Sequence, residues 1–344
     1  MKNTPYIVLA LCLLLASCKN EDWEFPDFDY QTVYFAYQYP VRTITLGDDI
    51  FDTSMDNEGK FKIMATTGGV YSSPQDVHLD VAVDESLIEK LKFDEGGDMV
   101  EALPSEYYQL SGQTIVIPRG EVTGGIEINL NSGFFNDPKA IRNTYVIPLR
   151  ITQISNADSI LSGVAQVENP QRNNPNDWSV QPKDFVLYAL KYVNPWHGNY
   201  LRRGQDVITS LNGNSAMDEI VVRHADFVVN DEVNLLTTRS MDEVEFPISF
   251  PGEDGENIAA DLLLTFGDDG NCTVSPLGDG YTASGTGKFI SKGEKKSWGN
   301  QDRDVLYLEY IINLPEMQIE TKDTLVVRDR AVGFETFTPV LSNN

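Results

Sequence analysis

Apolar and polar residues alternate with a period of two along much of the chain. Apolar side chains take every second position over residues 77–83, 126–131 and 145–151, and glycine pairs separate several of these segments. A β-strand points successive side chains to opposite faces, so each segment predicts a strand with one face on a core. Residues 29–166 are therefore predicted to form an immunoglobulin-like β-sandwich, in which Pro148 marks an edge strand or a bulge.

The second half of the chain repeats this pattern after a break. Residues 167–180 are polar and contain two prolines, which is typical of a linker. Beyond the break, apolar runs at 185–193 and 244–250 and a hairpin signal at 267–270 predict further strands. About eight strands joined by tight turns suit an up-and-down β-barrel over residues 181–344. The predicted fold class is all-β, with a sandwich followed by a barrel.

The first residues indicate secretion. An apolar run over residues 6–16, preceded by Lys2, is typical of a signal peptide and is too short to span a bilayer. It ends in Leu15-Ala16-Ser17-Cys18, which resembles the bacterial lipobox. The resemblance implies that residues 1–17 are removed and that Cys18 is acylated. The alternative is an ordinary signal peptide with an accidental cysteine.

Residues 18–28 are predicted to form a tether. Lys19 is followed within a few residues by acidic side chains, with Asn20 between them, and this stretch is similar to the tethers of surface-exposed Bacteroidetes lipoproteins. A solvated linker without an export signal is the alternative. The resemblance implies a protein that is lipid-anchored in the outer membrane and faces the cell exterior.

Charge and cysteine content narrow the possible partners. The chain has 344 residues, with 52 acidic and 26 basic side chains, and a formal net charge of −26. Such a balance argues against a nucleic-acid partner, because phosphate binding needs basic patches. Once Cys12 leaves with the signal peptide and Cys18 is acylated, Cys272 has no disulfide partner. It shares strand parity with Val274, so it is predicted to be a free thiol buried inside the barrel.

Several short motifs resemble a known family. In the first half they are Val33-Tyr34-Phe35, Gly69-Val70-Tyr71-Ser72-Ser73, Leu103-Pro104 and Tyr145-Val146-Ile147-Pro148-Leu149. In the second half they are Trp196-His197-Gly198-Asn199-Tyr200, Asp323-Thr324-Leu325-Val326 and Arg328-Asp329-Arg330. As a set they resemble Bacteroidetes surface lipoproteins encoded in polysaccharide-utilisation loci, which pair a β-sandwich with a calycin-type barrel of the lipocalin or streptavidin kind. The resemblance implies glycan binding beside an outer-membrane glycan importer, and it implies no catalytic residue.

The chemistry-bearing residues predict neither a metal centre nor a cofactor site. His78, His197 and His224 are far apart in sequence and no paired cysteines exist. The acidic segments 253–256 and 268–271 could bind Ca²⁺ through carboxylate oxygens, although hairpin turns explain both more simply. Glycosidase chemistry would need two carboxylates facing each other across a cleft, which a sequence cannot show. The chain is therefore predicted not to be an enzyme.

Sugar binding needs aromatic faces beside amides or carboxylates. Trp298, Asn300, Asp302 and Tyr200 are the candidate glycan-binding residues, with Trp298 predicted to be exposed on a loop. Trp196 is predicted to close one end of the barrel instead. The leading hypothesis is a non-catalytic glycan-binding lipoprotein. The alternatives are a structural or protein-interaction module of the importer complex and, third, a glycan-active enzyme.

Overall fold

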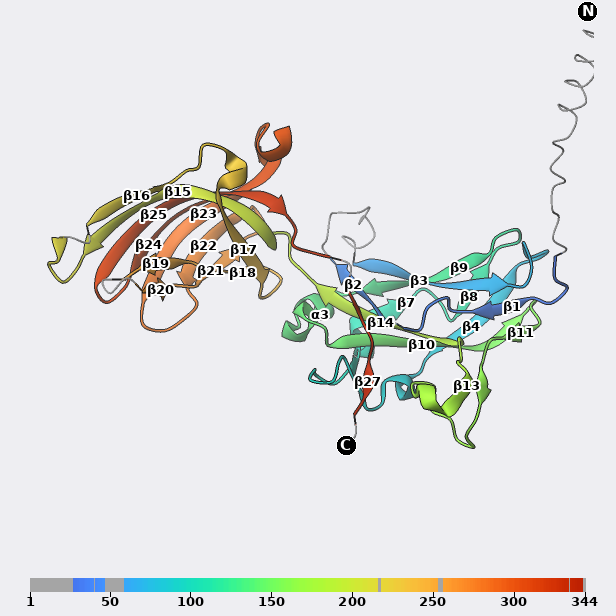
Figure 1. Cartoon of the computed structure of the whole chain (residues 1–344). Coiled ribbons are helices and arrows are strands. Elements are labelled where there is room, and N and C mark those ends of the chain that lie inside the picture. Colours follow the sequence, from blue (N-terminus) through green and yellow to red (C-terminus); the bar gives the residue numbers. More distant parts are fainter. Residues whose placement is uncertain are drawn as a thin grey trace, which may run out of the picture.

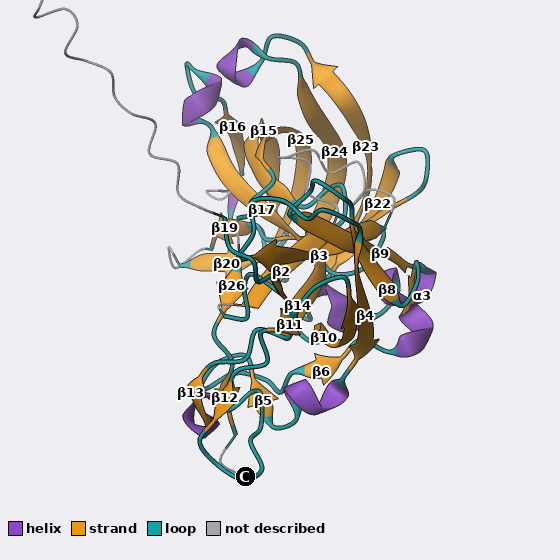
Figure 2. Ribbon diagram, turned by 90° about the vertical axis from the view of Figure 1, so that its right-hand side faces the viewer, coloured by secondary structure: helices purple, strands orange, loops and turns teal. Residues whose placement is uncertain are grey.

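The structure, a computed structural model, describes residues 27–39, 41–46, 59–215, 218–252, 256–333 and 335–342. The signal peptide, the tether through residue 26 and Cys18 lie outside the described residues. A β-sandwich and a β-barrel lie at opposite ends of an elongated molecule (Figure 1). Figure 2 views the molecule from the sandwich end, with the barrel strands behind. The predicted all-β fold with a sandwich and a barrel is confirmed.

Two sheets make up the sandwich. The first has the order β11 (Ser159–Ile160), β1 (Thr32–Tyr34), β3 (Lys60–Gly68), β9 (Thr123–Leu130) and β7 (Tyr108–Leu110). The second has the order β26 (Thr336–Phe337), β2 (Val41–Leu46), β14 (Phe185–Tyr192), β10 (Tyr145–Ser155), β4 (Val77–Val83) and β8 (Thr114–Ile117), with β6 (Glu101–Ala102) beside β10. Their alternating apolar residues, such as Ile63, Leu79 and Ile147, are wholly buried between the sheets.

Strand β14 lies in the sandwich, although residues 181–344 were expected to form the barrel. It pairs with β10 on one side and β2 on the other. Val186 and Leu190 face the core between the sheets, whereas Phe185 and Leu187 face a second apolar cluster that includes Leu91 and Phe337. A strand buried on both faces reads as a continuous apolar run, which explains the uninterrupted hydrophobicity of residues 185–190.

Residues 167–180 also differ from the expected linker. They contain the short helix η4 (Pro175–Asp177) and strand β13 (Trp178–Val180), which pairs with β12 (Val164–Ala165). Trp178 is 7% exposed, and its Nε1 donates to the carbonyl of Gln171 at 2.9 Å. The segment is a folded part of the sandwich that its polar composition did not reveal.

Pro148 lies in the central strand β10, so of the two expectations the edge strand is wrong, while β10 does carry a bulge, between Ile151 and Gln153. Its carbonyl accepts from Asp84 N at 2.9 Å, just beyond the end of β4 at Val83. The nitrogen of a strand residue points to the same side as its carbonyl. The missing N–H therefore costs no ladder hydrogen bond, because β4 has already ended there.

Eight antiparallel strands close the barrel. In order these are β15 (Gly198–Ser210), β17 (Glu232–Thr238), β18 (Glu243–Phe246), β21 (Leu262–Phe266), β22 (Asn271–Pro276), β23 (Thr282–Glu294), β24 (Arg303–Asn313) and β25 (Met317–Asp329), and β25 pairs back onto β15. Strand β16 (Glu219–Arg223) pairs with the second half of β15, beyond the end of β17. Consecutive strands are neighbours, so the barrel is of the predicted up-and-down type.

The barrel is inserted into the sandwich. The chain leaves the sandwich after β14, forms the barrel, and returns to pair β26 with β2. The two connections lie together, because the guanidinium of Arg330 donates to the carbonyls of Asn194 and Pro195. Lys191 and Glu335 form an ion pair of 2.5 Å on the sandwich side. The barrel domain is thus held at both of its ends.

Candidate functional site

A depression of about 810 Å³ lies on the outer face of β21 to β24. Cys272 on β22 and Leu308 on β24 are buried and point into the barrel. The residues next to them along each strand therefore point outward. The outward side chains that line it are Thr265, Asn271, Thr273, Thr286, Lys288, Tyr307 and Glu309. They supply hydroxyls, an amide, two charges and one aromatic ring.

A second depression of about 430 Å³ continues across β23, β24, β25 and β15. It shares Thr286 and Glu309 with the first depression, so the two are contiguous. We call the combined feature the outer groove. Its further outward side chains are Gln205, Val207, Ser284, Ile311, Glu320 and Lys322.

One polar row runs across six strands in the outer groove. Strand register places Thr265 opposite Thr273, and Thr273 opposite Thr286. The row continues through Glu309, Lys322 and Gln205. Since neighbouring strands lie about 4.8 Å apart, the row is about 24 Å long. It presents hydrogen-bonding groups along a length that several linked sugar rings could follow.

The charges in the outer groove nearly balance. Lys322 pairs with Glu309 at 3.1 Å, and Lys288 Nζ donates to the carbonyl of Asp269 at 2.6 Å. Hydrogen bonding from the backbone N–H of Asn271 lowers the pKa of Asp269 and keeps that carboxylate ionised. Two lysines thus stand among three carboxylates, the third being Glu320. This balance favours a neutral ligand over a polyanion.

Tyr307 lines the outer groove next to Glu309 along β24, and Trp298 packs on the same apolar cluster as Tyr307. This cluster, on the outside of the barrel, consists of Leu201, Val305 and Val326. Tyr307 Oη donates to Glu294 Oε1 at 2.6 Å, which fixes the ring. Tyr307 is therefore an aromatic side chain at the groove that the sequence did not single out.

Trp298 is half-buried, not the exposed platform that was expected. The guanidinium carbon of Arg303 lies 4.6 Å from the centre of its ring, and Arg303 Nε donates to the Trp298 carbonyl at 3.1 Å. One ring face is thus covered by Arg303, while the side chain packs on the apolar cluster. The residue holds the loop on the barrel, so stacking of a sugar on Trp298 would have to displace Arg303.

The other candidate residues do not lie together in one site. Tyr200 is wholly buried, and its hydroxyl donates to the Trp196 carbonyl at 2.9 Å, so its assignment to glycan binding is wrong. Asp302 is exposed and holds its own loop through Lys295 and the backbone of Lys296. Asn300 is exposed in the same loop with φ of 56°. Trp196 stacks on Phe266 with ring centroids 4.0 Å apart, as expected of a residue that packs against the barrel core.

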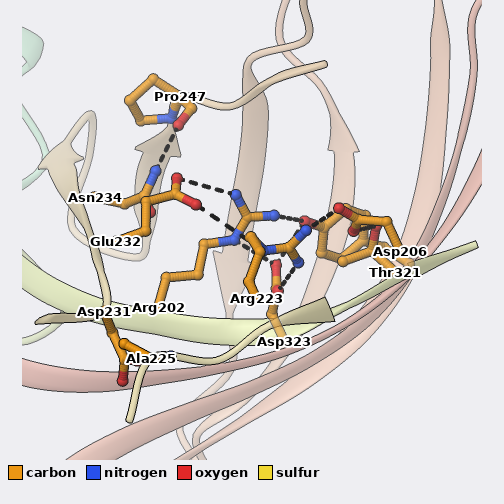
Figure 3. Close-up of polar contacts among 11 residues, drawn as sticks. Arg202, Asp206, Arg223, Ala225, Asp231, Glu232, Asn234, Pro247, Thr321 and Asp323 are labelled. Carbon is orange, nitrogen blue, oxygen red and sulfur yellow. Dashed lines mark hydrogen bonds and ion pairs between the residues drawn. The ribbon is translucent and has the colours of Figure 1, made fainter. Parts of the chain in front are cut away.

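A buried charge network lies on the inner face of the strands that carry the outer groove (Figure 3). Arg202 Nε pairs with Asp323 Oδ2 at 2.9 Å, and Arg202 Nη2 donates to Tyr310 Oη at 3.1 Å. Tyr310 Oη in turn donates to Asp323 Oδ2 at 2.7 Å. Burial acts to lower the pKa of Arg202, but Tyr310, Asp323 and Glu232 outweigh it and raise that pKa. The guanidinium is held as a cation.

Arg223 completes this network from β16. It pairs with Asp206 and, at 2.6 Å, with Asp323 Oδ1. Thr321 Oγ1 donates to Asp206 Oδ1 at 2.7 Å. Both aspartates are 3% exposed, so each buried carboxylate is neutralised by an arginine. Tyr310, Thr321 and Asp323 alternate along their strands with Glu309 and Lys322 of the groove, so the network braces the wall from inside.

Gly204 makes room for the network. A Cβ atom at this position would meet both Asp323 Oδ1 and the backbone carbonyl of Lys322, and it would lie 3.0 Å from Arg223 Nη2. Arg202, Gly204 and Asp206 share strand parity with the buried Tyr200 and Ile208. Polar residues at inward positions between apolar ones were the sequence signal of this network. The outer groove left no such signal, because threonine, lysine and glutamate are ordinary on a solvent-facing strand surface.

The cysteine prediction is confirmed. Cys272 is a free thiol, 4% exposed, and burial raises its pKa to about 12.

The acidic segment 268–271 forms a hairpin turn, in which Gly267 N donates to the Asn271 carbonyl at 2.8 Å. Residues 253–255 of the other acidic segment lie outside the described residues. Within the described part of the chain, no group of three or more His, Cys, Asp or Glu side chains could hold a metal ion, and no helix is long and apolar enough to cross a membrane.

Two domain families match the chain. A domain of unknown function, DUF5627, matches residues 195–331, which are the barrel, and an N-terminal domain family matches residues 28–158 of the sandwich. No curated protein matches the chain. Two solved structures from Bacteroides ovatus are only distantly similar. A multidomain protein including DUF1735 is 13% identical with a TM-score of 0.40, and the match covers 87% of this chain and 94% of that chain. A candidate carbohydrate-binding protein is 14% identical with a TM-score of 0.29, and the match covers 71% of this chain and 67% of that chain. Neither likeness bears on function.

A third structure is much more similar. It is a structural-genomics protein of unknown function from Bacteroides ovatus, solved at 2.40 Å. The two sequences are 44% identical, the TM-score is 0.86, and the match covers 92% of this chain and 100% of that chain. The present chain therefore belongs to the same protein family as this Bacteroides ovatus protein, with a DUF5627 barrel inserted into its sandwich.

Proposed function

We propose that this protein is a non-catalytic lipoprotein of the outer membrane, facing the cell exterior, that binds neutral glycans in the outer groove beside a glycan importer. The observation that carries the proposal is the polar row from Thr265 to Gln205 with Tyr307 at its edge. Linked hydroxyls of a sugar chain need closely spaced donors and acceptors, together with an aromatic face. The groove provides both on a rigid barrel wall.

The ligand class follows from charge. A protein with a net charge of −26 repels polyanionic glycans, and the groove itself adds no excess of lysine. An open, shallow site with one aromatic ring suits an affinity in the micromolar-to-millimolar range, which corresponds to about −4 to −8 kcal/mol. Binding of an internal stretch of a chain fits the open groove better than capture of a sugar terminus.

Catalysis is not part of the proposal. In the described part of the barrel the buried carboxylates Asp206, Asp231 and Asp323 each pair with an arginine. Each is held by that arginine, whereas glycosidase chemistry needs two carboxylates that face each other across an open cleft. We expect the protein to bind oligosaccharides without releasing new reducing ends.

Affinity electrophoresis tests the proposal. Residues 19–344 are run through gels that contain neutral polysaccharides or, in parallel, polyuronic and sulphated ones. We expect retardation by a neutral polysaccharide, reduced by Tyr307→Ala and unchanged by Tyr37→Ala, a matched control because Tyr37 is 77% exposed in the sandwich. Retardation by polyanions alone, or equal loss in both variants, would contradict the proposal.

A protein-interaction module is the alternative function. The outward side chains of Ile220 and Val222 on β16 are 61% and 66% exposed, and Phe227 nearby is 68% exposed. Exposed apolar side chains on one strand are typical of a protein contact surface. This alternative predicts that Val222→Ser abolishes crosslinking to an outer-membrane importer, while the purified protein binds none of the polysaccharides.

A further inference from the structure

Three exposed aromatic side chains gather at the end of the sandwich where the described chain begins. Phe28 is 71% exposed, Tyr30 57% and Tyr71 65%. We call these residues the aromatic tip. Large aromatic side chains that are exposed together in one cluster are typical of an interaction surface.

Backbone contacts hold the aromatic tip together. The Asp27 carboxylate accepts from Phe28 N and from Tyr71 N, both at 2.9 Å. A Cβ atom added to Gly69 would meet the carbonyl of Tyr30, so the loop before Tyr71 lies directly against Tyr30. Gly69 has φ of 93° and can make this close approach because it has no side chain. Two segments that are far apart in sequence, residues 27–30 and residues 69–71, thus form one surface.

The position of the tip relative to the lipobox suggests its partner. Cys18 precedes Phe28 by ten residues. Whatever conformation those residues take, ten peptide units reach no farther than about 35 Å. The acylated residue must therefore lie within that distance of the tip, while the barrel lies at the opposite end of the molecule (Figure 1). The tip is the part of the fold that the anchor holds nearest to the membrane.

We propose that the aromatic tip is a lipid-contacting surface, which seats the sandwich on the membrane that holds the Cys18 acyl chains. The inference rests on the lipid anchoring in the proposed function. Tyrosine and other aromatic rings are favoured at the headgroup level of a bilayer, where an apolar ring and a polar edge are both satisfied. Asp27 and Asp29 stand beside the rings, so the surface suits zwitterionic headgroups better than anionic ones. Seated in this way, the molecule would carry the outer groove away from the membrane.

Lipid-dependent quenching of a fluorophore tests this proposal. The full lipidated protein is reconstituted into phosphatidylcholine–phosphatidylethanolamine vesicles with doxyl-labelled lipid. One sample carries an environment-sensitive label at Ser72→Cys, which is exposed beside Tyr71, and another carries it at Glu316→Cys, which is exposed on the barrel. The buried thiol of Cys272 does not compete for the label.

We expect the doxyl lipid to quench the label at position 72 and to spare the label at position 316. The triple variant Phe28→Ser, Tyr30→Ser, Tyr71→Ser should reduce quenching at 72 to the level of the barrel label. The matched triple Tyr37→Ser, Ile220→Ser, Val222→Ser also removes three exposed apolar side chains, and it should leave quenching unchanged. Adding phosphatidylglycerol should weaken the quenching.

Each of the remaining possible results contradicts a different part of the proposal. If the protein binds vesicles but the label at position 72 is not quenched, the tip does not contact lipid, although the anchor is supported. The same conclusion holds if quenching at position 72 persists in the Phe28→Ser, Tyr30→Ser, Tyr71→Ser variant. Protein that fails to co-float with vesicles shows that Cys18 is not acylated, and then both the anchor and the tip inference fail. Tip-dependent retardation in the polysaccharide gels, without lipid quenching, would reassign the tip to glycan binding.

Discussion

The interiors of the sandwich and of the barrel are built differently. Between the sandwich sheets the buried side chains are almost all apolar, as with Ile63, Leu79 and Leu149. The barrel has an apolar region around Phe246 and Leu264, but its interior also contains Arg202, Asp206 and Asp323, each 3% exposed. The sandwich also buries Asp184, which pairs with Arg150 and Arg172. Apolar burial nevertheless dominates between the sandwich sheets, whereas part of the barrel interior depends on a set of charges that must all be present together.

This difference predicts opposite sensitivities. Loss of one apolar group leaves a cavity whose cost depends on how far the surroundings can relax. Loss of one member of the charge network leaves its partner charged, buried and unpaired, which costs more than the pair itself contributes. Tryptophan fluorescence can separate the two domains in two backgrounds, one that keeps only Trp178 of the sandwich and one that keeps only Trp196 and Trp298 of the barrel. The other tryptophans, Trp23 included, are changed to phenylalanine.

The largest effect is expected for Asp323→Ala. Removing this carboxylate leaves the more exposed Glu232 as the shared partner of Arg202 and Arg223. Breaking a buried ion pair costs about 3–5 kcal/mol of the free energy of unfolding. Glu309→Ala removes the exposed partner of Lys322 in the same two strands and should cost less than about 1 kcal/mol. Urea unfolding should show a shifted barrel transition only for Asp323→Ala. Equal shifts for both variants would contradict the account of the network.

Leu79→Ala is expected to act on the sandwich. Its side chain is wholly buried between the sheets, so truncation should cost about 2–5 kcal/mol. The Trp178 signal should move to lower urea concentration while the barrel signal keeps its midpoint. A common shift of both signals would show that the inserted barrel and the sandwich unfold as one unit, and the proposed contrast between the domains would fail.

Gly204→Ala should have a smaller effect on the barrel. The added methyl group would meet Asp323 Oδ1 and the backbone carbonyl of Lys322 and press on Arg223, and overpacking of this kind costs about 1–3 kcal/mol. At Gly96, where the nearest atom to an added Cβ lies 3.9 Å away, the same substitution should change stability by less than about 0.5 kcal/mol. Thermal unfolding of both variants would measure what filling the space at Gly204 costs, and equal midpoints for the two variants would contradict the close packing described there.

The smallest expected effect concerns pH. Burial, with Arg330 and Lys191 nearby, lowers the pKa of His197 from 6.5 to about 4. The unfolded chain therefore binds a proton between pH 6.5 and 4 that the folded chain does not, so stability falls as pH decreases through this window. The loss should be on the order of 1–2 kcal/mol, allowing for partial exposure of the ring. His197→Asn keeps an acceptor for Thr238 N, and its stability should depend less on pH in this window; an unchanged slope would refute the assignment.

Much of the fold could be predicted from the sequence, because half-buried strands alternate and turns contain glycine. The domain boundary could not be predicted. Strand β14 is apolar on both faces, and only its pairing with β2 and β10 assigns it to the sandwich. The return of the chain to β26 is a long-range pairing that leaves no local pattern.

The candidate site was harder to predict. The expected Trp298 lies near the outer groove, but Arg303 covers one of its faces, and a contact between loop side chains is invisible in a linear pattern. Tyr307 and the threonine row became a site only through strand register, which places residues from six strands side by side. Each of these residues alone looks like an ordinary solvent-facing position.

Calorimetry on one pair of variants tests the central claim, that the outer groove binds a glycan. Thr273 and Thr237 are both exposed, outward-facing threonines of barrel strands, but only Thr273 lines the groove. With a neutral oligosaccharide that the wild-type protein binds, Thr273→Arg should block binding, and Thr237→Arg should bind with the wild-type affinity. Undiminished binding by Thr273→Arg, in a protein that unfolds at the wild-type temperature, would contradict the claim.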